Sequence, residues 1–112
     1  MSADIEAIRR QLKIKTGSVR RLLKENGLYR AEAADNQAKL DKLRADGAEE
    51  WDVKNATRLV QESEKMIEDT KGRLGRAVGE LRDLVDQVEK QPELAQDEEF
   101  LKAKEALEEA AI

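Results

Sequence analysis

Residues 53–88 read VKNATRLVQESEKMIEDTKGRLGRAVGELRDLVDQV, and the spacing of the apolar residues in this stretch decides the fold class. Alternating steps of three and four residues run through the whole stretch, and polar side chains interrupt them only at Ser63 and Thr70. Residues three and four apart lie on one face of a helix, so this spacing matches the helical period. The stretch predicts one long amphipathic helix over about residues 52–89.

The N-terminal part of the chain has the same pattern. From Ile5 to Leu43, nine of the twelve positions reached by the same steps are apolar or aromatic. This predicts a first helix over about residues 4–45, which would be roughly 60 Å long at about 1.5 Å per residue. The polar Lys15 on this stripe is expected to lay its stem over the core and keep its ammonium group in water.

The segment between the two helices, Ala45-Asp46-Gly47-Ala48-Glu49-Glu50, has the composition of a turn. Gly47 is suited to a positive φ. Asp52 is the expected N-cap of the second helix, and Trp51 just before it is expected to pack on Ala56 as a hydrophobic staple. Because the connection has only about six residues, the two helices should be antiparallel neighbours.

The single proline, Pro92, predicts the start of a third helix, because the first turn of a helix does not need the N–H that proline lacks. This helix is expected over about residues 92–110. The residues expected to face inward are Leu94, Phe100, Leu101, Ala103 and Leu107. The predicted fold is all-α: an up-down-up three-helix bundle of long, coiled-coil-like helices with a shorter third helix, in a single helical domain over residues 1–112.

Polar residues interrupt the expected seam between the two long helices. If the hairpin folds about Ala48, Asn26 faces Thr70 and Ala33 faces Ser63. A polar pair buried in a helical seam can specify the register at some cost in stability. At the edge of the seam the same residues would stay in contact with water, and the sequence leaves both interpretations open.

Composition narrows the classes of function. The chain has 112 residues, of which 41% are charged, 39% hydrophobic and 3% aromatic, and it contains no cysteine or histidine. That composition excludes disulfides, thiolate catalysis, zinc sites and serine–histidine chemistry. No apolar run is long enough to span a membrane and no signal-peptide core is present, so we expect a cytosolic protein without a membrane partner. Phosphate and calcium loops are also missing, so neither an enzyme nor a cofactor or metal site is expected.

A basic block and an acidic block stand near opposite ends of the chain. Seven basic residues and no acid lie between Arg9 and Lys24, whereas seven acids and two lysines follow from Glu93 onward. In the predicted bundle the third helix returns alongside the first half of the first helix, so the two blocks would partly neutralise each other. The net charge of −4 argues against nucleic acid as a partner of the whole chain.

The basic block has a second interpretation, as a binding surface. Heptad geometry predicts that five basic residues and two apolar neighbours point away from the seam. They are Arg10, Lys13, Arg20, Arg21 and Lys24, with Ile14 and Leu28. Apolar residues exposed within a basic face suit an acidic protein partner better than a nucleic acid, because the face offers no aromatic side chain for base stacking.

Several runs of residues resemble a known family. The longest are LKIKTGSVRRLLKE at residues 12–25 and QESEKMIED at residues 61–69. Shorter matching positions are Tyr29, Glu32-Ala33, Arg44-Ala45, Trp51-Asp52 and Arg73-Leu74. In this order and spacing they resemble the tubulin-binding cofactor A family over most of residues 8–85, and the third helix is similar in composition and through Glu98-Glu99-Phe100. Two positions depart from the family pattern: Glu68 stands where many members have proline, and Trp51 where tyrosine is more usual.

The resemblance implies a tubulin-folding chaperone. Such a protein captures β-tubulin after the cytosolic chaperonin and passes it on to heterodimer assembly with other tubulin-folding cofactors, as a cytoplasmic, cytoskeleton-associated monomer or homodimer without nucleotide or metal. The outward basic residues would steer the acidic tubulin towards a rigid helical surface. Because the short third helix leaves the turn side of the hairpin uncovered, Leu59, Met66 and neighbouring residues of the first helix form a second candidate binding surface.

A rival function uses the same heptads for self-association, in a structural coiled-coil adaptor or tether. Specific binding to β-tubulin, absent for α-tubulin and for unrelated acidic proteins, would distinguish the chaperone from the adaptor. An RNA-binding hairpin that used the basic block would instead show steep salt dependence and retain nucleic acid.

Overall fold

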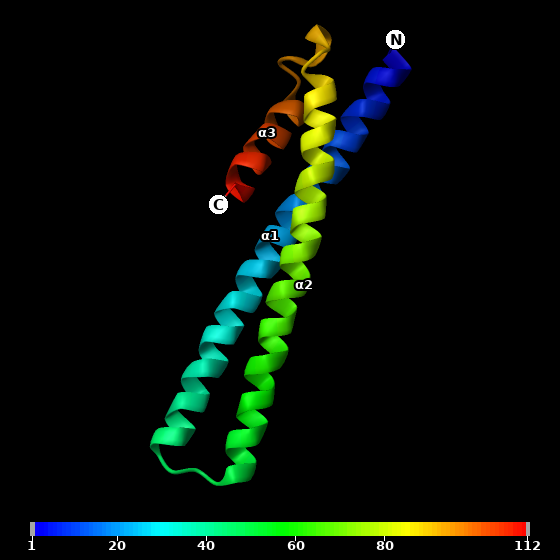
Figure 1. Ribbon diagram of the computed structural model, residues 1–112. Coiled ribbons are helices and arrows are strands. Elements are labelled where there is room, and N and C mark those ends of the chain that lie inside the picture. Colours follow the sequence, from blue (N-terminus) through cyan, green and yellow to red (C-terminus); the bar gives the residue numbers. More distant parts are fainter. Residues whose placement is uncertain (1, 112) are drawn as a thin grey trace. The chain divides into compact units, whose positions relative to one another are not determined.

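A computed structural model gives the structure of the protein and describes residues 2–111, with side chains from residue 4 onward. The helices are α1 (Ser2–Ala45), α2 (Glu50–Val88) and α3 (Glu98–Ala110), and a short 3₁₀ helix, η1 (Pro92–Leu94), precedes α3. The chain reverses direction after α1 and again after α2 (Figure 1). No strand occurs among the described residues. The prediction of an all-α, up-down-up three-helix bundle with a shorter third helix is confirmed.

The chain divides into two compact units. Unit 1 contains residues 1–23 and 73–112, and unit 2 contains residues 24–72. Unit 1 therefore combines the first half of α1, the second part of α2, and α3. Unit 2 is the hairpin formed by the remaining parts of α1 and α2 with the turn between them (Figure 1).

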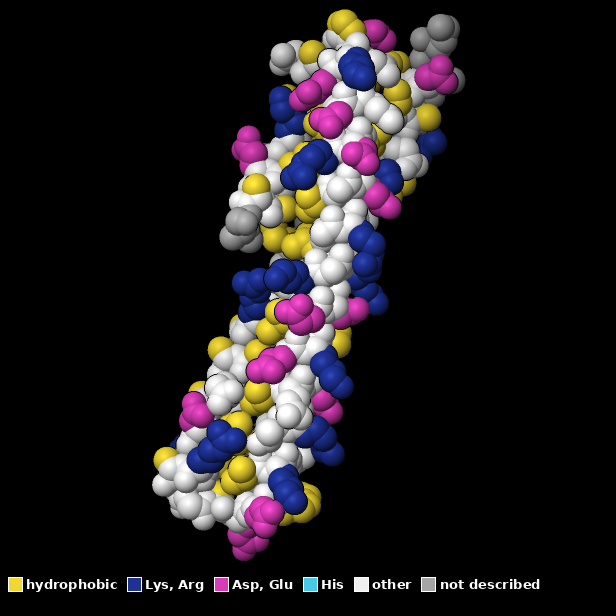
Figure 2. Space-filling view, in the orientation of Figure 1, with side chains coloured by type: hydrophobic (Ala, Val, Ile, Leu, Met, Phe, Trp, Pro, Cys, Tyr) yellow, Lys and Arg dark blue, Asp and Glu magenta, His cyan; other side chains and the backbone are white. Residues whose placement is uncertain are grey.

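Unit 1 has an apolar core to which all three helices contribute. The nine buried residues of this core are Leu12, Val19, Leu81, Val85, Val88, Leu94, Phe100, Ala103 and Ala106. Figure 2 shows hydrophobic side chains gathered between α3 and α2 in this unit. Burying one large aliphatic or aromatic side chain contributes roughly 1.5–3 kcal/mol, so this core is the main source of stability in unit 1.

The third α-helix begins later than the sequence predicts. Pro92 opens η1, and α3 starts after its N-cap, Asp97. Asp97 Oδ2 accepts hydrogen bonds from the backbone N–H groups of Glu99 at 2.9 Å and Phe100 at 3.4 Å. The start predicted at Pro92 is therefore wrong: proline fits the first position of a 3₁₀ turn equally well, and the side-chain cap at Asp97 sets the boundary of α3.

The inward face of α3 also differs from the prediction at one position. Leu94, Phe100 and Ala103 are buried as expected, and Leu107 packs partly buried against the core. Leu101 is exposed. Phe100, Ala103 and Ala106 form the side of α3 that faces the core. Each residue advances a helix by about 100°, so Leu101, directly after Phe100, points away from that side.

Unit 2 is a two-helix hairpin with polar groups buried in its seam. Its turn contains Gly47 with a φ of 70°, as the sequence predicts. Asn26 Nδ2 donates hydrogen bonds to Thr70 Oγ1 at 2.9 Å and to the carbonyl oxygen of Ile67 at 3.2 Å. Both Asn26 and Thr70 are buried. This favours the interpretation that the pair fixes the register, and disfavours the alternative in which both residues stay in contact with water at the edge of the seam.

The second polar contact in the seam involves a different partner from the expected one. Ser63 Oγ accepts a hydrogen bond of 2.8 Å from Asn36 Nδ2, whereas the sequence prediction placed Ala33 opposite Ser63. Asn36 lies one turn closer to the hairpin turn than Ala33 and carries an amide, so it can satisfy the buried hydroxyl, which alanine cannot.

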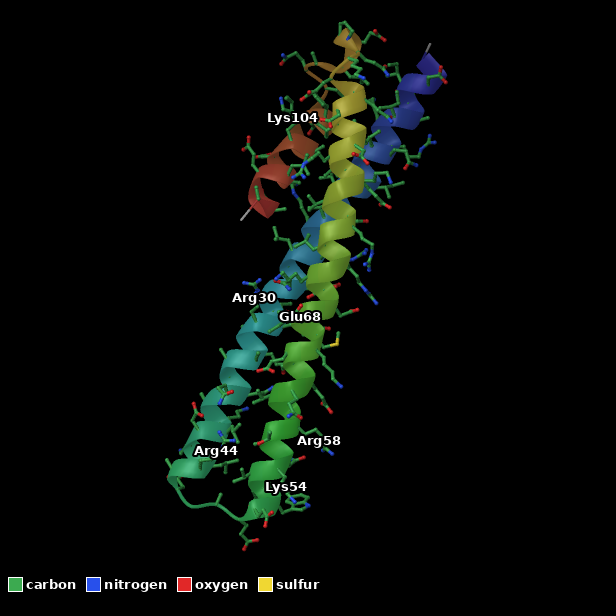
Figure 3. The ribbon with its side chains drawn as sticks, in the orientation of Figure 1. Arg30, Arg44, Lys54, Arg58, Glu68 and Lys104 are labelled. Atoms are coloured by element: carbon green, nitrogen blue, oxygen red, sulfur yellow. The ribbon has the colours of Figure 1, made fainter. Side chains whose placement is uncertain are left out.

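The start of α2 corrects two details of the prediction. The helix begins at Glu50, so Asp52 lies in the first turn instead of serving as the N-cap, and there its charge still favours the positive end of the helix. Trp51 lies inside this first turn and is 73% exposed, so it does not form the expected staple on Ala56. Further along, α2 continues without interruption through Glu68 (Figure 3).

Candidate protein-binding surfaces

The first half of α1, in unit 1, presents a basic and partly apolar surface. Arg10 and Lys13 are exposed, and Ile14, which directly follows Lys13 and lies one turn after Arg10, is 54% exposed. Arg10 and Ile14 lie on the side of α1 opposite to Leu12, which is fully buried in the core, and Lys13 lies on the flank of the helix. Arg21, one heptad after Ile14, is also exposed. The geometry therefore agrees with the outward placement that the heptads predict.

Other residues of the basic block meet acidic residues within unit 1. Arg9 Nε lies 2.7 Å from Asp97 Oδ1, and Arg20 Nη2 lies 3.8 Å from carboxylate oxygens of both Glu105 and Glu109 in α3. Lys15 Nζ lies 3.6 Å from Glu80 of α2, with only part of the lysine side chain in solvent. The basic block is thus partly neutralised by the acids of α3, and Arg20 is half-buried beside that helix.

Arg9 and Asp97 form the most sheltered of these pairs, because only 12% of the Asp97 side chain is exposed. The Asp97 carboxylate, followed by that of Glu6 at 3.2 Å, raises the pKa of the Arg9 guanidinium above its ordinary value. Asp97 therefore has two roles: one carboxylate oxygen caps α3 and the other contacts α1.

Unit 2 presents the remaining predicted residues. Lys24 and Leu28 are exposed on α1, with 60% of Leu28 accessible to solvent, and Leu59 and Met66 are partly exposed on α2. Large aliphatic side chains left in water are normal when they are scattered, but they indicate an interaction surface where they gather beside a hollow.

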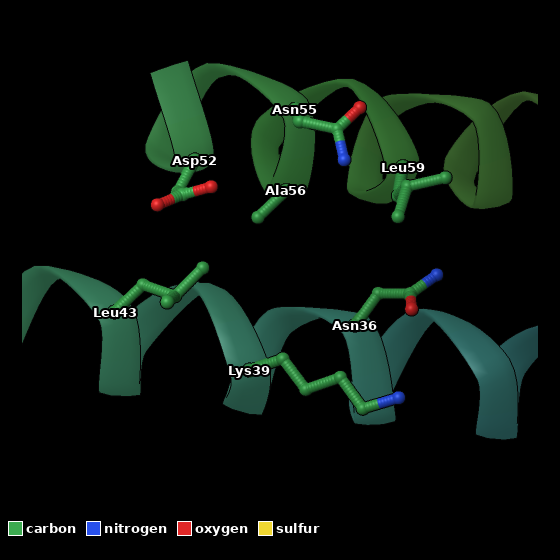
Figure 4. A pocket seen from close by; sticks show the side chains of 7 residues that line it. All are labelled: Asn36, Lys39, Leu43, Asp52, Asn55, Ala56 and Leu59. Atoms are coloured by element: carbon green, nitrogen blue, oxygen red, sulfur yellow. The ribbon is translucent and has the colours of Figure 1, made fainter. Parts of the chain in front are cut away.

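Two shallow hollows run along the seam of unit 2. The larger, of about 230 Å³, is lined by Asn36, Lys39 and Leu43 from α1 and by Asp52, Asn55, Ala56 and Leu59 from α2 (Figure 4). The smaller, of about 160 Å³, is lined by Tyr29, Glu32, Asn36, Leu59, Glu62, Ser63 and Met66. Leu59 and Met66, predicted as neighbours on the turn side, therefore line one hollow. The sequence prediction expected neighbouring residues of the first helix there without naming them, and the structure identifies them as Tyr29, Glu32 and Asn36.

Within residues 2–111, no group of three or more Asp or Glu residues is placed to hold a metal ion. None of the described helices combines the length and the apolar character that crossing a membrane requires.

Comparison with known proteins confirms the resemblance. The family model described as Tubulin binding cofactor A matches residues 7–107. Human tubulin-specific chaperone A is 39% identical over 95 residues, which cover 85% of each chain. The solved structure of human tubulin chaperone cofactor A has a TM-score of 0.79 and 37% identity, over 94% of this chain and 99% of that chain. The crystal structure of tubulin folding cofactor A from Arabidopsis thaliana has a TM-score of 0.86 and 30% identity, over 94% and 96%.

The match covers the residues that build both units, from the first turns of α1 to the last turns of α3. Sequence and fold agree, and the chain belongs to the tubulin binding cofactor A family.

Proposed function

We propose that this protein is a tubulin-folding chaperone that captures β-tubulin after its release from the chaperonin and passes it on to heterodimer assembly. Membership of the tubulin binding cofactor A family supports a role in tubulin folding. The choice of β-tubulin and the point of capture in the folding pathway are inferences from the resemblance of the sequence to that family.

The observation that carries the proposal is the exposure of Ile14 beside the cations of Arg10 and Lys13 in unit 1. An apolar side chain within a basic face suits an acidic protein whose newly folded surface still contains apolar patches, because the cations attract the partner and the apolar group is buried on contact. Arg20 contributes less to this attraction, because Glu105 and Glu109 lie close to its guanidinium group.

In the proposed mechanism the cations act mainly before contact. Charges on a protein surface raise the rate of association with an oppositely charged partner, and salt screens that effect over a Debye length of about 10 Å at 0.1 M ionic strength. Leu28, Leu59 and Met66 in unit 2 offer further apolar area that a tubulin surface would cover, which would keep the captured tubulin from aggregating.

The test is a titration of this protein against β-tubulin released from chaperonin, read by size-exclusion chromatography. We expect a discrete complex with β-tubulin and none with α-tubulin. The double variant Arg10→Glu/Lys13→Glu should weaken the complex by about tenfold at low salt and much less at high salt, because the change acts through long-range charge. Ile14→Ser should weaken it by a similar amount at all salt concentrations.

A matched control is Arg76→Glu/Arg82→Glu, which makes the same change in net charge at exposed positions of α2 in unit 1. An equal loss of affinity in the control would show that net charge, and not this face of α1, determines binding. Unchanged affinity of Arg10→Glu/Lys13→Glu at low salt would contradict the steering role. If no complex formed and the protein eluted only as its own oligomer, the coiled-coil adaptor would become the better account.

A further inference from the structure

The largest exposed apolar side chain of the protein has no role in the fold described above. Trp51 is the single tryptophan of the chain, and 73% of its surface is accessible although the first turn of α2 is otherwise polar. Tryptophan is enriched at protein interfaces, where its large rigid ring contributes much of the binding energy. An indole that leaves most of its surface in water is therefore a reason to look for a partner.

The surroundings of Trp51 define the chemistry of that partner. Trp51, Lys54, Asn55 and Arg58 line an open hollow of about 300 Å³ in unit 2. Lys54, Asn55 and Arg58 are three, four and seven residues beyond Trp51, so all four residues share one face of α2. Figure 3 shows Lys54 and Arg58 near the turn end of this helix. The hollow thus combines an aromatic face, two cations and an amide.

Both cations have weak partners that a ligand can replace. Lys54 Nζ lies 3.4 Å from Glu50 and Arg58 Nε lies 4.0 Å from Glu62, and the side chains in both pairs are more than half exposed. Exposed pairs of this kind are individually weak, so exchanging them for the carboxylates of a partner costs little. Arg58 Nη2 also donates a hydrogen bond of 2.8 Å to Asn55 Oδ1, which holds the guanidinium beside the hollow.

Acidic residues on the other side of Trp51 limit how a partner can approach. Glu49 and Glu50 line a neighbouring hollow with Trp51 and Lys54, and Lys54 lines both hollows. Carboxylates therefore border one side of the indole, and Arg58 is the cation that lines only the other hollow. This arrangement repels a long polyanion such as a nucleic acid, since its phosphates would meet both sides. It accepts a short acidic segment on the side of Arg58.

We propose that Trp51, Lys54, Asn55 and Arg58 form a docking surface for a short acidic segment of a protein partner. An aliphatic side chain of the segment packs on the indole of Trp51, and neighbouring carboxylates bind Lys54 and Arg58, the arginine through its planar pair of donors. This surface contains none of the residues proposed above for tubulin capture, and it does not depend on tubulin being the partner.

The experiment uses the full chain and the peptide Glu-Glu-Leu-Glu-Glu-NH2 with fluorescein on its N-terminal amine, with binding read by fluorescence anisotropy. The unlabelled peptide provides a second readout: because Trp51 is the only tryptophan, any change in intrinsic indole emission arises at this surface. We expect saturable binding with a blue shift of the emission. Replacing the four glutamates by glutamine, or by lysine, should abolish both signals, because the cations then have no carboxylate to bind.

Variants assign the binding to these residues. Trp51→Ala and the double variant Lys54→Glu/Arg58→Glu should each weaken peptide binding by at least about tenfold, as hot-spot substitutions do. The control Lys65→Glu/Lys71→Glu makes the same change in net charge at exposed positions of α2 outside the hollow, and it should retain at least half of the affinity. Circular dichroism checks that all variants stay helical.

Three results would overturn the proposal. They are no binding of the acidic peptide up to millimolar concentration, equal losses in the double variant and its control, or tighter binding of a single-stranded oligonucleotide than of the peptide. Because no tubulin is present, failure here leaves the tubulin titration with Arg10 and Lys13 as a separate test.

Discussion

Units 1 and 2 use the same two helices in different ways. In unit 1, α3 closes over α1 and α2, and nine buried residues form an apolar core. In unit 2 only two helices are present, the buried hydrophobic residues are Leu40 and Val60, and Asn26, Ser63 and Thr70 are buried beside them. Two packed helices leave much of each helix in water, whereas a third helix encloses a mainly apolar interior, in which the polar Thr16 is also buried.

The difference suggests that unit 1 provides most of the stability and that unit 2 fixes the register of the two long helices. The apolar core of unit 1 provides free energy of folding, because burial of apolar area is its dominant favourable contribution. The hydrogen bonds of unit 2 contribute less free energy but select one pairing, since Asn26 finds a hydroxyl and a carbonyl acceptor only when it lies opposite Thr70 and Ile67.

The largest expected effect comes from breaking the core of unit 1 at Phe100. Phe100→Ala should lower the free energy of unfolding by about 3–5 kcal/mol, because it removes a buried ring that α3 contributes to the core. The adjacent Leu101→Ala, at an exposed position, should cost less than about 1 kcal/mol. Urea denaturation followed by circular dichroism measures both. Similar losses for the two variants would contradict the inward face assigned to α3.

The polar seam of unit 2 offers the second test. Asn26→Ala should cost about 1–3 kcal/mol in urea denaturation, because it removes a buried donor with two acceptors. The double variant Asn26→Leu/Thr70→Val should be at least as stable as the natural chain, since an apolar pair replaces both partners.

The double variant should nevertheless align its helices less uniquely. We expect a mixture of monomer and larger species by light scattering, because apolar seams without a polar pair tolerate alternative registers and partners. A single species identical to the natural protein would show that the hydrogen bonds in the seam do not determine the register.

The smallest of the three effects concerns the start of α3. Asp97→Ala should lower the free energy of unfolding by about 1 kcal/mol, because two backbone N–H groups lose their cap. Asp97→Asn keeps a capping oxygen but loses the charge that faces Arg9, so the difference between the two variants separates the cap from the ion pair. Equal losses in both would mean that the ion pair dominates.

The fold was predictable because it depends on periodicity. Over α1 and α2 the apolar steps continue for many turns, and the structure differs from the predicted ends by a few residues at most. The start of α3 was predicted less well, because Pro92 and Asp97 are both good helix starts, and the side-chain cap that Asp97 makes in the structure decides between them.

The candidate surfaces were predictable only in part. Heptad positions identified Ile14 and Leu28 as exposed, because exposure on a long helix follows from phase alone. The pairing of Arg20 with Glu105 and Glu109 depends on where α3 lies across the chain, which local pattern does not determine. The hollow beside Trp51 was missed because that residue has a standard structural role before a helix, and a start of α2 two residues earlier removes the role.

The two ends of α3 are held unequally. At its first turn the sheltered Asp97 joins the helix to Arg9, and Phe100 fills the core. Towards its last turn, Arg20 of α1 contacts Glu105 and Glu109, each at 3.8 Å, and both of these ion pairs are exposed to solvent. We therefore expect the helix to fray from its C-terminal end, so that backbone amides there exchange their hydrogens with solvent before those behind the cap.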